Sequence, residues 1–190
     1  MSPKDKKLKY IADLVAQCTK CPLYKTATNP VPGSGDSKTE IVLIGEAPGF
    51  YEDQQGLPFV GNSGKLLDRL LADIKLSREE VFICNILKHR PPNNRDPLPN
   101  EIRACVPYLK AQLQVIEPKV IVTLGRFALN YFFPQDMISR VHGQIKQFVW
   151  QEQNLSMIPV YHPSAALRST SNLKALEEDF RKIGKYLNKI

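Results

Sequence analysis

The sequence predicts an α/β fold, a three-layer sandwich with a central four-stranded parallel sheet. Two observations lead to this prediction: short apolar runs recur along the chain, and segments with helical periodicity separate them. With 190 residues, the chain has the length of one domain, residues 1–190, and is large enough to bury a hydrophobic core.

Four apolar runs predict the strands, because each is short, rich in β-branched residues and bounded by loop residues. The predicted strands are residues 41–45, 81–87, 120–124 and 157–161. Helical segments lie between successive strands, and a crossover helix is the usual connection between parallel strands. The sequence therefore predicts a parallel sheet rather than a set of hairpins.

The predicted helices have apolar residues three and four positions apart, which is the period of one helix face. They are residues 4–17, 63–74, 100–116, a helix that starts near residue 125, and 172–187. Residues 22–36 and 90–99 contain too many prolines for regular structure. These two segments are therefore predicted to be loops.

Composition and charge narrow the class of protein. Hydrophobic residues make up 43% of the chain and charged residues 24%, which is typical of a globular protein. No apolar run approaches the ~20 residues of a membrane helix, and the charged segment 1–10 lacks the apolar stretch of a signal peptide. We therefore expect a cytoplasmic protein without membrane contact, and a monomer. The net charge of +7 suits a polyanionic partner such as DNA.

One stretch carries most of the predicted chemistry. Residues 45–61 read GEAPGFYEDQQGLPFVG and follow the apolar strand 41–45 directly. Ligand sites of open parallel sheets form at the carboxyl ends of strands, and glycines let the backbone approach a ligand closely. The stretch also contains the carboxylates Glu46, Glu52 and Asp53. It is therefore the first candidate for a binding or catalytic loop.

A second motif, His162-Pro163-Ser164, follows the last predicted strand. Together the two motifs resemble the active-site motifs of the uracil-DNA glycosylase superfamily, and the pattern GEAPG…ED…G.PFVG resembles its family 4, the iron–sulfur group. The resemblance extends from about residue 18 to about residue 167. It implies a uracil-DNA glycosylase-like fold and a monofunctional DNA repair hydrolase. Such an enzyme cleaves the N-glycosidic bond of uracil in DNA and leaves an abasic site.

The resemblance also implies the residues of a uracil pocket. Phe59 would stack on the base, and Asn85 would read its N3–H and its 4-carbonyl. His162 would donate to the 2-carbonyl, where negative charge develops as the glycosidic bond breaks. Glu46 and Ala47 of the first motif would line the same pocket.

A carboxylate near the sugar should stabilise the oxocarbenium-like transition state. The best-known family of the superfamily uses an aspartate two residues after the motif's glycine, where this chain has Ala47. Glu46 is therefore the first candidate for the acidic group, followed by Asp53 and then Glu52. We expect a catalytic set of Glu46, Asp53 and His162.

The cysteines indicate a cofactor rather than disulfides, which are rare in the reducing cytoplasm. Cys18 and Cys21 form a CxxC pair, a pattern that serves metals, clusters or redox exchange. The pair is followed by Pro22 and Leu23 and resembles the start of the family's cluster-binding sequence, and Cys105 matches a further cluster cysteine. The resemblance thus implies a 4Fe-4S cluster.

The fourth cluster ligand is open, because the family's lysine–cysteine–arginine–proline–proline segment reads KHRPP here, at residues 88–92. His89 stands in place of the cysteine, and histidine can replace cysteine at iron. Cys84 is the rival, although it should point away from the site if its neighbour Asn85 points toward it. A solvent ligand, or no fourth ligand at all, is the remaining alternative. We expect the metal ligands to be Cys18, Cys21, His89 and Cys105. Zinc at the same residues is the alternative.

The segment after His162 resembles the loop that enters the minor groove of DNA. Leu167 is the candidate for the wedge that fills the gap left by the flipped base, and apolar wedges are a recurrent way to distort a duplex. Ser164 and Arg168 are further DNA-binding candidates. Candidates for additional backbone contacts are Lys88, Arg90 and Arg95.

Two other functions fit parts of the sequence. A non-catalytic iron–sulfur module that binds DNA or senses redox state would need the cluster, but not the combination of Phe59, Asn85 and His162. A relative that traps uracil-containing DNA covalently would carry an inserted loop rich in arginine and histidine, whereas segment 88–105 is short and rich in proline. Both comparisons favour the glycosylase.

Overall fold

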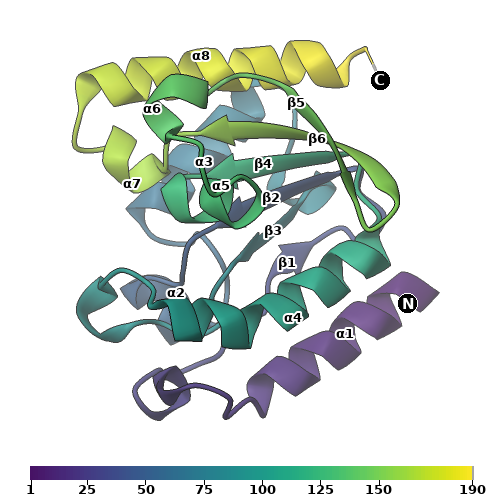
Figure 1. Ribbon diagram of the computed structural model, residues 1–190, viewed down its shortest axis with the longest axis vertical. Coiled ribbons are helices and arrows are strands. Elements are labelled where there is room, and N and C mark those ends of the chain that lie inside the picture. Colours follow the sequence, from purple (N-terminus) through teal and green to yellow (C-terminus); the bar gives the residue numbers. More distant parts are fainter. Residues whose placement is uncertain (190) are drawn as a thin grey trace.

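The computed structural model describes residues 1–189 and shows one mixed sheet between layers of helices (Figure 1). The strands in this part of the chain are β1 (Ser34–Gly35), β2 (Ile41–Gly45), β3 (Phe82–Asn85), β4 (Val120–Leu124), β5 (Lys146–Trp150) and β6 (Gln153–Val160). Their order in the sheet is β1-β3-β2-β4-β6-β5. The neighbouring strands β3, β2, β4 and β6 run parallel, whereas β1 and β5 pair antiparallel at the two edges.

The predicted central sheet of four parallel strands is confirmed, and β2, β3 and β4 are buried along their whole length. Such burial is expected when helices cover both faces of a sheet. Two predicted bounds were wrong, because β3 is shorter than 81–87 and β6 begins well before residue 157. The edge strands were not predicted. β1 has only 2 residues, and the turn between β5 and β6 uses Gln151 and Glu152 at positive φ, where hairpins usually show Asn-Gly.

The α-helices of the described residues are α1 (Pro3–Ala16), α2 (Phe50–Gln55), α3 (Asn62–Asp73), α4 (Pro99–Ile116), α5 (Arg126–Phe132), α6 (Ile138–Val141), α7 (Pro163–Ala166) and α8 (Thr170–Leu187). Short 3-10 helices are η1 (Pro22–Lys25), η2 (Arg78–Glu80) and η3 (Pro92–Asn94). Helices α3 and α8 cover one face of the sheet, α4 and α5 cover the other, and α1 packs on the outer side of α4 (Figure 1). Within residues 1–189, no helix is both long enough and apolar enough to cross a membrane.

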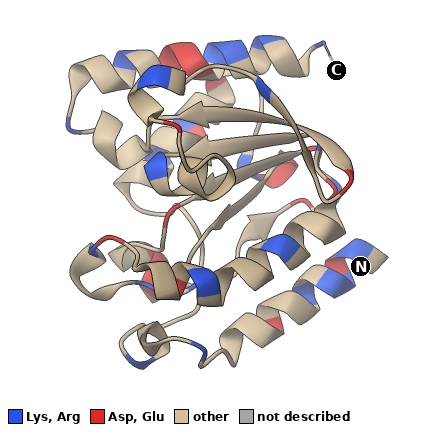
Figure 2. Cartoon of the chain, in the orientation of Figure 1, with Lys and Arg blue, Asp and Glu red and all other residues tan. Residues whose placement is uncertain are grey.

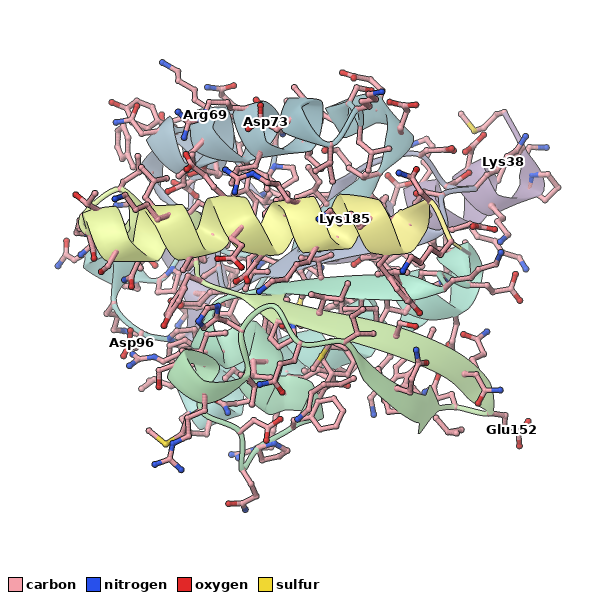
Figure 3. The ribbon with its side chains drawn as sticks, turned by 90° about the horizontal axis from the view of Figure 1, so that it is seen from above. Lys38, Arg69, Asp73, Asp96, Glu152 and Lys185 are labelled. Carbon is pink, nitrogen blue, oxygen red and sulfur yellow. The ribbon has the colours of Figure 1, made fainter. Side chains whose placement is uncertain are left out.

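Alternating strand residues fill two separate cores. Leu43 of β2 belongs to the core beneath α3 and α8, and the next residue, Ile44, belongs to the core beneath α4. This division follows from the alternation of side chains along a strand. Figure 3 shows α3 and α8 side by side, and Arg69 of α3 pairs with Glu177 of α8 at 2.9 Å. The helix layer over this face is therefore joined by a polar contact as well as by the core.

The motif 45–61 contains one helix that was not predicted. Helix α2 begins after Gly49 and ends at Gly56, which adopts a left-handed conformation with φ 69°. Its first turn carries Glu52 and Asp53, and acidic side chains there are favoured by the positive end of the helix dipole. The helix has only 6 residues between two glycines, which is too short for a periodic pattern.

Candidate active site

The carboxyl ends of the parallel strands bring the sequence motifs together. Strands β2 and β3 end at the register partners Gly45 and Asn85, and His162 follows closely after β6. In Figure 1 these strand ends face left, toward α2 and α7. This edge is the candidate site, as expected for an open parallel sheet.

Asn85 presents an unpaired acceptor at this edge. Its side-chain oxygen, Oδ1, is buried and has no hydrogen-bond partner among residues 1–189. A Cβ atom at Gly45 would lie 2.3 Å from this oxygen and 2.7 Å from the Phe59 ring, so only glycine fits between them. An unpaired buried polar group costs about 1–3 kcal/mol. Beside the Phe59 ring, Asn85 Oδ1 is placed to accept from the N–H group of a flat ligand.

The Phe59 ring is held by a loop in an unusual conformation. Phe59 has φ 52°, in the left-handed region that bulky residues rarely adopt. Arg78 donates to the carbonyl oxygens of Pro58 (2.8 Å) and Phe59 (2.5 Å). Helix α3 also approaches closely, because a Cβ atom at Gly64 would lie 1.8 Å from the Phe59 oxygen. The ring is thereby fixed with its centroid 5.7 Å from that of His162.

His162 is held as a neutral imidazole with its proton on Nε2. The Ser164 backbone N–H donates to His162 Nδ1 (3.1 Å), and Ser164 Oγ lies 2.8 Å from the same atom. Nδ1 is therefore an acceptor, which places the ring proton on Nε2. The pKa of His162 is lowered to about 4, chiefly by burial and also by the charge of Arg168, while Glu52 acts in the opposite direction. Gly125, with φ 92°, makes room for the ring, since a Cβ atom there would lie 3.0 Å from His162 Cβ.

Glu46 follows β2 directly and is half-buried. The pKa of its carboxyl group is raised to about 7, chiefly by burial and also by the charge of Asp96, while Arg126 acts in the opposite direction. Asp96 and Arg126 form an exposed ion pair with an N–O distance of 2.5 Å. Asp96 is labelled in Figure 3 and lies on the left, the side to which the strand ends point in Figure 1. Glu46 thus changes its charge near neutral pH, which suits a group that acts on a proton or a cation.

The other two carboxylates of the motif bind backbone groups. Glu52 Oε1 accepts from the N–H groups of Val60 (2.8 Å) and Gly61 (2.9 Å). Asp53 is almost fully buried, and its Oδ1 accepts from the N–H of Thr28 at 2.8 Å. Both side chains therefore hold loops around α2, whereas the carboxylate of Glu46 is not used in this way.

The segment after His162 divides into two parts. The hydroxyl and the backbone N–H of Ser164 both contact His162 Nδ1, so Ser164 orients the imidazole ring. Leu167 follows α7 and is 51% exposed, and Arg168 Nε donates to the Ser164 carbonyl at 3.2 Å. An apolar side chain and a guanidinium group therefore project beside the site.

One predicted DNA contact was wrong. Lys88 is fully buried, and its Nζ donates to the Asn85 carbonyl and to Gln112 Oε1, both at 2.8 Å. It cannot reach a phosphate on DNA, and it instead fixes the backbone where β3 ends. Arg95 is also engaged, since it pairs with Glu101 at 2.5 Å.

Three cysteines and His89 gather near the end of α1. Cys18 and His89 line one cavity of about 250 Å³. The pKa of the Cys105 thiol is raised to about 11, chiefly by burial. Lys88 acts in the opposite direction, and the nearby thiols of Cys21 and Cys18 contribute to the rise. These thiols are therefore close enough to influence one another. The donor set fits an iron–sulfur cluster, which takes thiolates and can accept imidazole.

Cys84 lies in a different environment. It is fully buried in the core beneath α4, and a Cβ atom at Gly33 would lie 2.9 Å from its Cβ. It does not line the cavity that Cys18 and His89 share. A larger cavity, about 520 Å³, runs along α4 and contains none of the candidate site residues.

Among residues 1–189, the structure shows no assembled site for a single metal ion. Zinc needs its ligands to converge on one point, at about 2.0–2.3 Å from each. Within the described residues, no group of three or more His, Cys, Asp or Glu side chains is placed to hold one metal ion.

Comparisons with known proteins identify the family. Residues 32–188 match the family model described as the uracil DNA glycosylase superfamily, so the chain belongs to this superfamily. Three relatives are type-4 uracil-DNA glycosylases. The protein from Saccharolobus solfataricus is 49% identical over 95% of this chain and 87% of its own. The protein from Archaeoglobus fulgidus is 48% identical over 92% of this chain and 90% of its own. The protein from Thermotoga maritima is 40% identical over 100% of this chain and 99% of its own. The resemblance inferred from the motifs is confirmed.

Several supporting residues of the site were not predicted. Arg78 lies 19 positions from Phe59 in the sequence, and nothing in its own segment indicates that it binds the Phe59 carbonyl. The pair Asp96 and Arg126 joins a proline-rich loop to the start of α5. Gly64 did offer a signal, because a glycine inside a helix often has a packing reason.

Proposed function

We propose that the protein is a monofunctional uracil-DNA glycosylase, which hydrolyses the N-glycosidic bond of uracil in DNA and leaves an abasic site. The family supports this proposal, since close relatives are type-4 uracil-DNA glycosylases. The observation that carries it is the buried, unpaired Asn85 Oδ1 beside the Phe59 ring.

A uracil seated against Phe59 would satisfy Asn85. Its N3–H would donate to Oδ1, and its 4-carbonyl would accept from the Nδ2 amide hydrogens. Cytosine lacks the N3–H and carries an amine at position 4, so the same amide would meet mismatched groups. Thymine differs by its 5-methyl group. We assign the exclusion of thymine to Glu52. Its Oε2 fills the space that a side chain at Gly49 would take, since a Cβ atom at Gly49 would lie 2.7 Å from this oxygen.

The reaction follows from the charges that develop. As the glycosidic bond breaks, negative charge collects on the uracil 2-carbonyl, and the Nε2–H of His162 donates to that oxygen. A pKa of about 4 keeps His162 neutral, so it stabilises the anion by a hydrogen bond. The Glu46 carboxylate stabilises the cationic sugar and orients a water molecule. Water then adds to C1′ of the sugar, and its proton passes to Glu46.

The first prediction concerns Glu46 and pH. Because only the ionised carboxylate stabilises a cation, the rate of uracil release should rise with pH through about 7, the pKa of Glu46. Below that pH the group is protonated and the rate falls, although His162 remains neutral down to about pH 4. In Glu46→Gln, uracil release should be slower. The fall in rate below about pH 7, the acid limb of the pH–rate profile, should disappear. Single-turnover rates measured between pH 5 and 9 check it.

Asp53→Asn is the matched control for the pH dependence of uracil release. The amide oxygen of asparagine can still accept from the Thr28 N–H, so the loop keeps its anchor. The acid limb should persist in this variant. If the limb disappears in Asp53→Asn and remains in Glu46→Gln, the acidic role belongs to Asp53.

An end-labelled oligonucleotide with a single uracil tests the function itself. A monofunctional enzyme should release free uracil and leave a strand that breaks only after alkali treatment. A strand broken without alkali would indicate a lyase, and a band that resists denaturant would indicate covalent trapping. Binding without release would indicate a non-catalytic module.

We propose that Leu167 and Arg168 contact the DNA beside the flipped uracil. Leu167 is an exposed apolar side chain next to the site, as a wedge requires. Arg168 carries a positive charge close to His162, where the phosphates of the target strand would lie. Lys and Arg residues are otherwise spread over α1, α4 and α8 (Figure 2), which suits weak attraction to any DNA.

We also propose that Cys18, Cys21, Cys105 and His89 hold a 4Fe-4S cluster. Cys18 and His89 face one cavity, and the thiols of Cys18, Cys21 and Cys105 influence one another. When bound, the cluster would join the end of α1, the segment before η3 and the start of α4, and metal binding energy becomes folding energy. Its role is therefore structural.

The second prediction concerns the fourth ligand. His89→Ala should lose cluster content, because one iron loses its protein ligand. His89→Cys should keep the cluster and lower its reduction potential, since imidazole ligation raises the potential relative to thiolate. Visible absorption, iron content and a redox titration of anaerobically purified protein measure these effects.

Cys84→Ala is the control for the cluster. It should keep the cluster and cost on the order of 1 kcal/mol of stability, as for a small truncation in a core. A cluster lost in Cys84→Ala and retained in His89→Ala would transfer the ligand role to Cys84. It would also require β3 to shift, because Cys84 and Asn85 point to opposite faces of the sheet.

A further inference from the structure

Helix α2 exposes its aromatic residues and buries its acidic ones. Phe50 and Tyr51 are 50% and 57% exposed, whereas Glu52 and Asp53 are buried. Among the described residues, Phe50 is the one exposed phenylalanine of the 8 in the chain. Large rings are usually buried and carboxylates exposed. This reversal indicates that the two rings serve a contact outside the protein.

The helix holds these rings in fixed positions next to the uracil site. Glu52 binds the N–H groups of Val60 and Gly61, in the same loop as Phe59. The Tyr51 ring lies against that loop, with Cδ2 3.2 Å from where a Cβ atom at Gly61 would be. The rings therefore belong to the rim of the site, and they need no rearrangement of the backbone to present their faces.

A positive charge accompanies the rings. The guanidinium carbon of Arg90 lies 5.2 Å from the centroid of the Phe50 ring, and the rings of Phe50 and Tyr51 meet edge to face at 5.4 Å. Nucleobases stack on aromatic rings whatever their sequence, and arginine adds to this by cation–π interaction and phosphate contact. An aromatic pair with arginine at the rim of a DNA site therefore matches the chemistry of unpaired nucleotides.

We propose that Phe50, Tyr51 and Arg90 form a stacking surface for unpaired bases next to the target uracil, so that the protein prefers uracil in single-stranded DNA. This inference rests on the proposed function for its location. In a duplex the neighbouring bases remain stacked and paired with the opposite strand. In a single strand they are free to stack on the two rings. The surface therefore contributes to the binding of single strands and little to the binding of duplexes.

Fluorescence anisotropy with a labelled single-stranded oligonucleotide tests this surface. The oligonucleotide carries one 2′-fluoro-deoxyuridine, which resists cleavage, and the matched duplex serves for comparison. Phe50→Ala and Tyr51→Ala should each raise the Kd for the single strand about 5–100-fold, the range of one lost base–aromatic stack. Tyr51→Phe keeps a ring and should bind like the wild type. The control Leu57→Ala removes another exposed apolar side chain just after α2 and should also bind like the wild type.

Replacing the bases next to the uracil by abasic spacers identifies stacking as the cause. With spacers, the wild type should bind at least as weakly as Phe50→Ala binds the intact single strand, and neither alanine substitution should have a further effect. The inference is overturned if Phe50→Ala weakens single strand and duplex equally, or if its effect survives the spacers. Uracil release by the wild type tests the proposed function separately. An active wild type whose Kd is unchanged in both alanine variants would refute only the stacking surface.

Discussion

Replacing Asn85 by alanine should nearly abolish uracil release. Wild-type Asn85 supplies one acceptor for the uracil N3–H and one donor for the 4-carbonyl, and the variant leaves both groups of the base unpaired in a buried pocket. Loss of such a matched polar edge should cost about 3–5 kcal/mol of transition-state stabilisation, or ~10²–10⁴-fold in kcat/KM. Single-turnover release from a uracil-containing oligonucleotide measures it.

Thr123→Val is a suitable control, because Thr123 Oγ1 is also buried without a hydrogen-bond partner among residues 1–189. Thr123 alternates with Val122 and Leu124, which lie in the core beneath α3 and α8, so its side chain points to the opposite face. The control should release uracil at the wild-type rate. Near wild-type release by Asn85→Ala would mean that the unpaired oxygen has no role in base recognition. The pocket would then need another reader of the uracil edge.

The sequence predicted those parts of the fold that depend on local patterns. Apolar runs and helical periods identified the central strands and the long helices, because burial on both faces leaves little choice of residue there. The motif residues Gly45, Asn85 and His162 could be placed at one edge, since parallel strands end on the same side. Their positions followed from topology rather than from any single residue.

The features that were missed depend on contacts between distant segments. Lys88 was expected at the surface, but Gln112 of α4 and the Asn85 carbonyl provide partners that allow its burial. The hydrogen bonds that Glu52 and Asp53 accept from backbone N–H groups of two other loops were not predicted either. Residue type alone does not distinguish a carboxylate that acts on substrate from one that anchors a loop. That difference emerges only when the partners are known.

Replacing His162 by alanine should slow uracil release ~10²–10³-fold, the usual effect of removing one preorganised donor to a developing oxyanion. DNA binding should remain nearly intact, because Leu167 and Arg168 stay in place. Ser164→Ala should have a much smaller effect. The Ser164 backbone N–H still donates to His162 Nδ1 at 3.1 Å and keeps the ring proton on Nε2. Single-turnover rates and anisotropy with uncleavable DNA separate the chemical step from binding.

The effects of His162→Ala and Ser164→Ala on rate, binding and stability distinguish a hydrogen-bond donor from a merely structural histidine. If His162 only packed beneath Phe59, its loss would weaken binding and folding together, and Ser164→Ala would be silent in every assay. If it donates to the leaving uracil, the chemical step slows while the Kd and the melting temperature change little. The effect should also be independent of pH between about 5 and 9, because a pKa of about 4 leaves His162 neutral throughout that range. A rate in His162→Ala equal to the wild-type rate would remove His162 from the mechanism and leave Asn85 as the base's remaining polar contact.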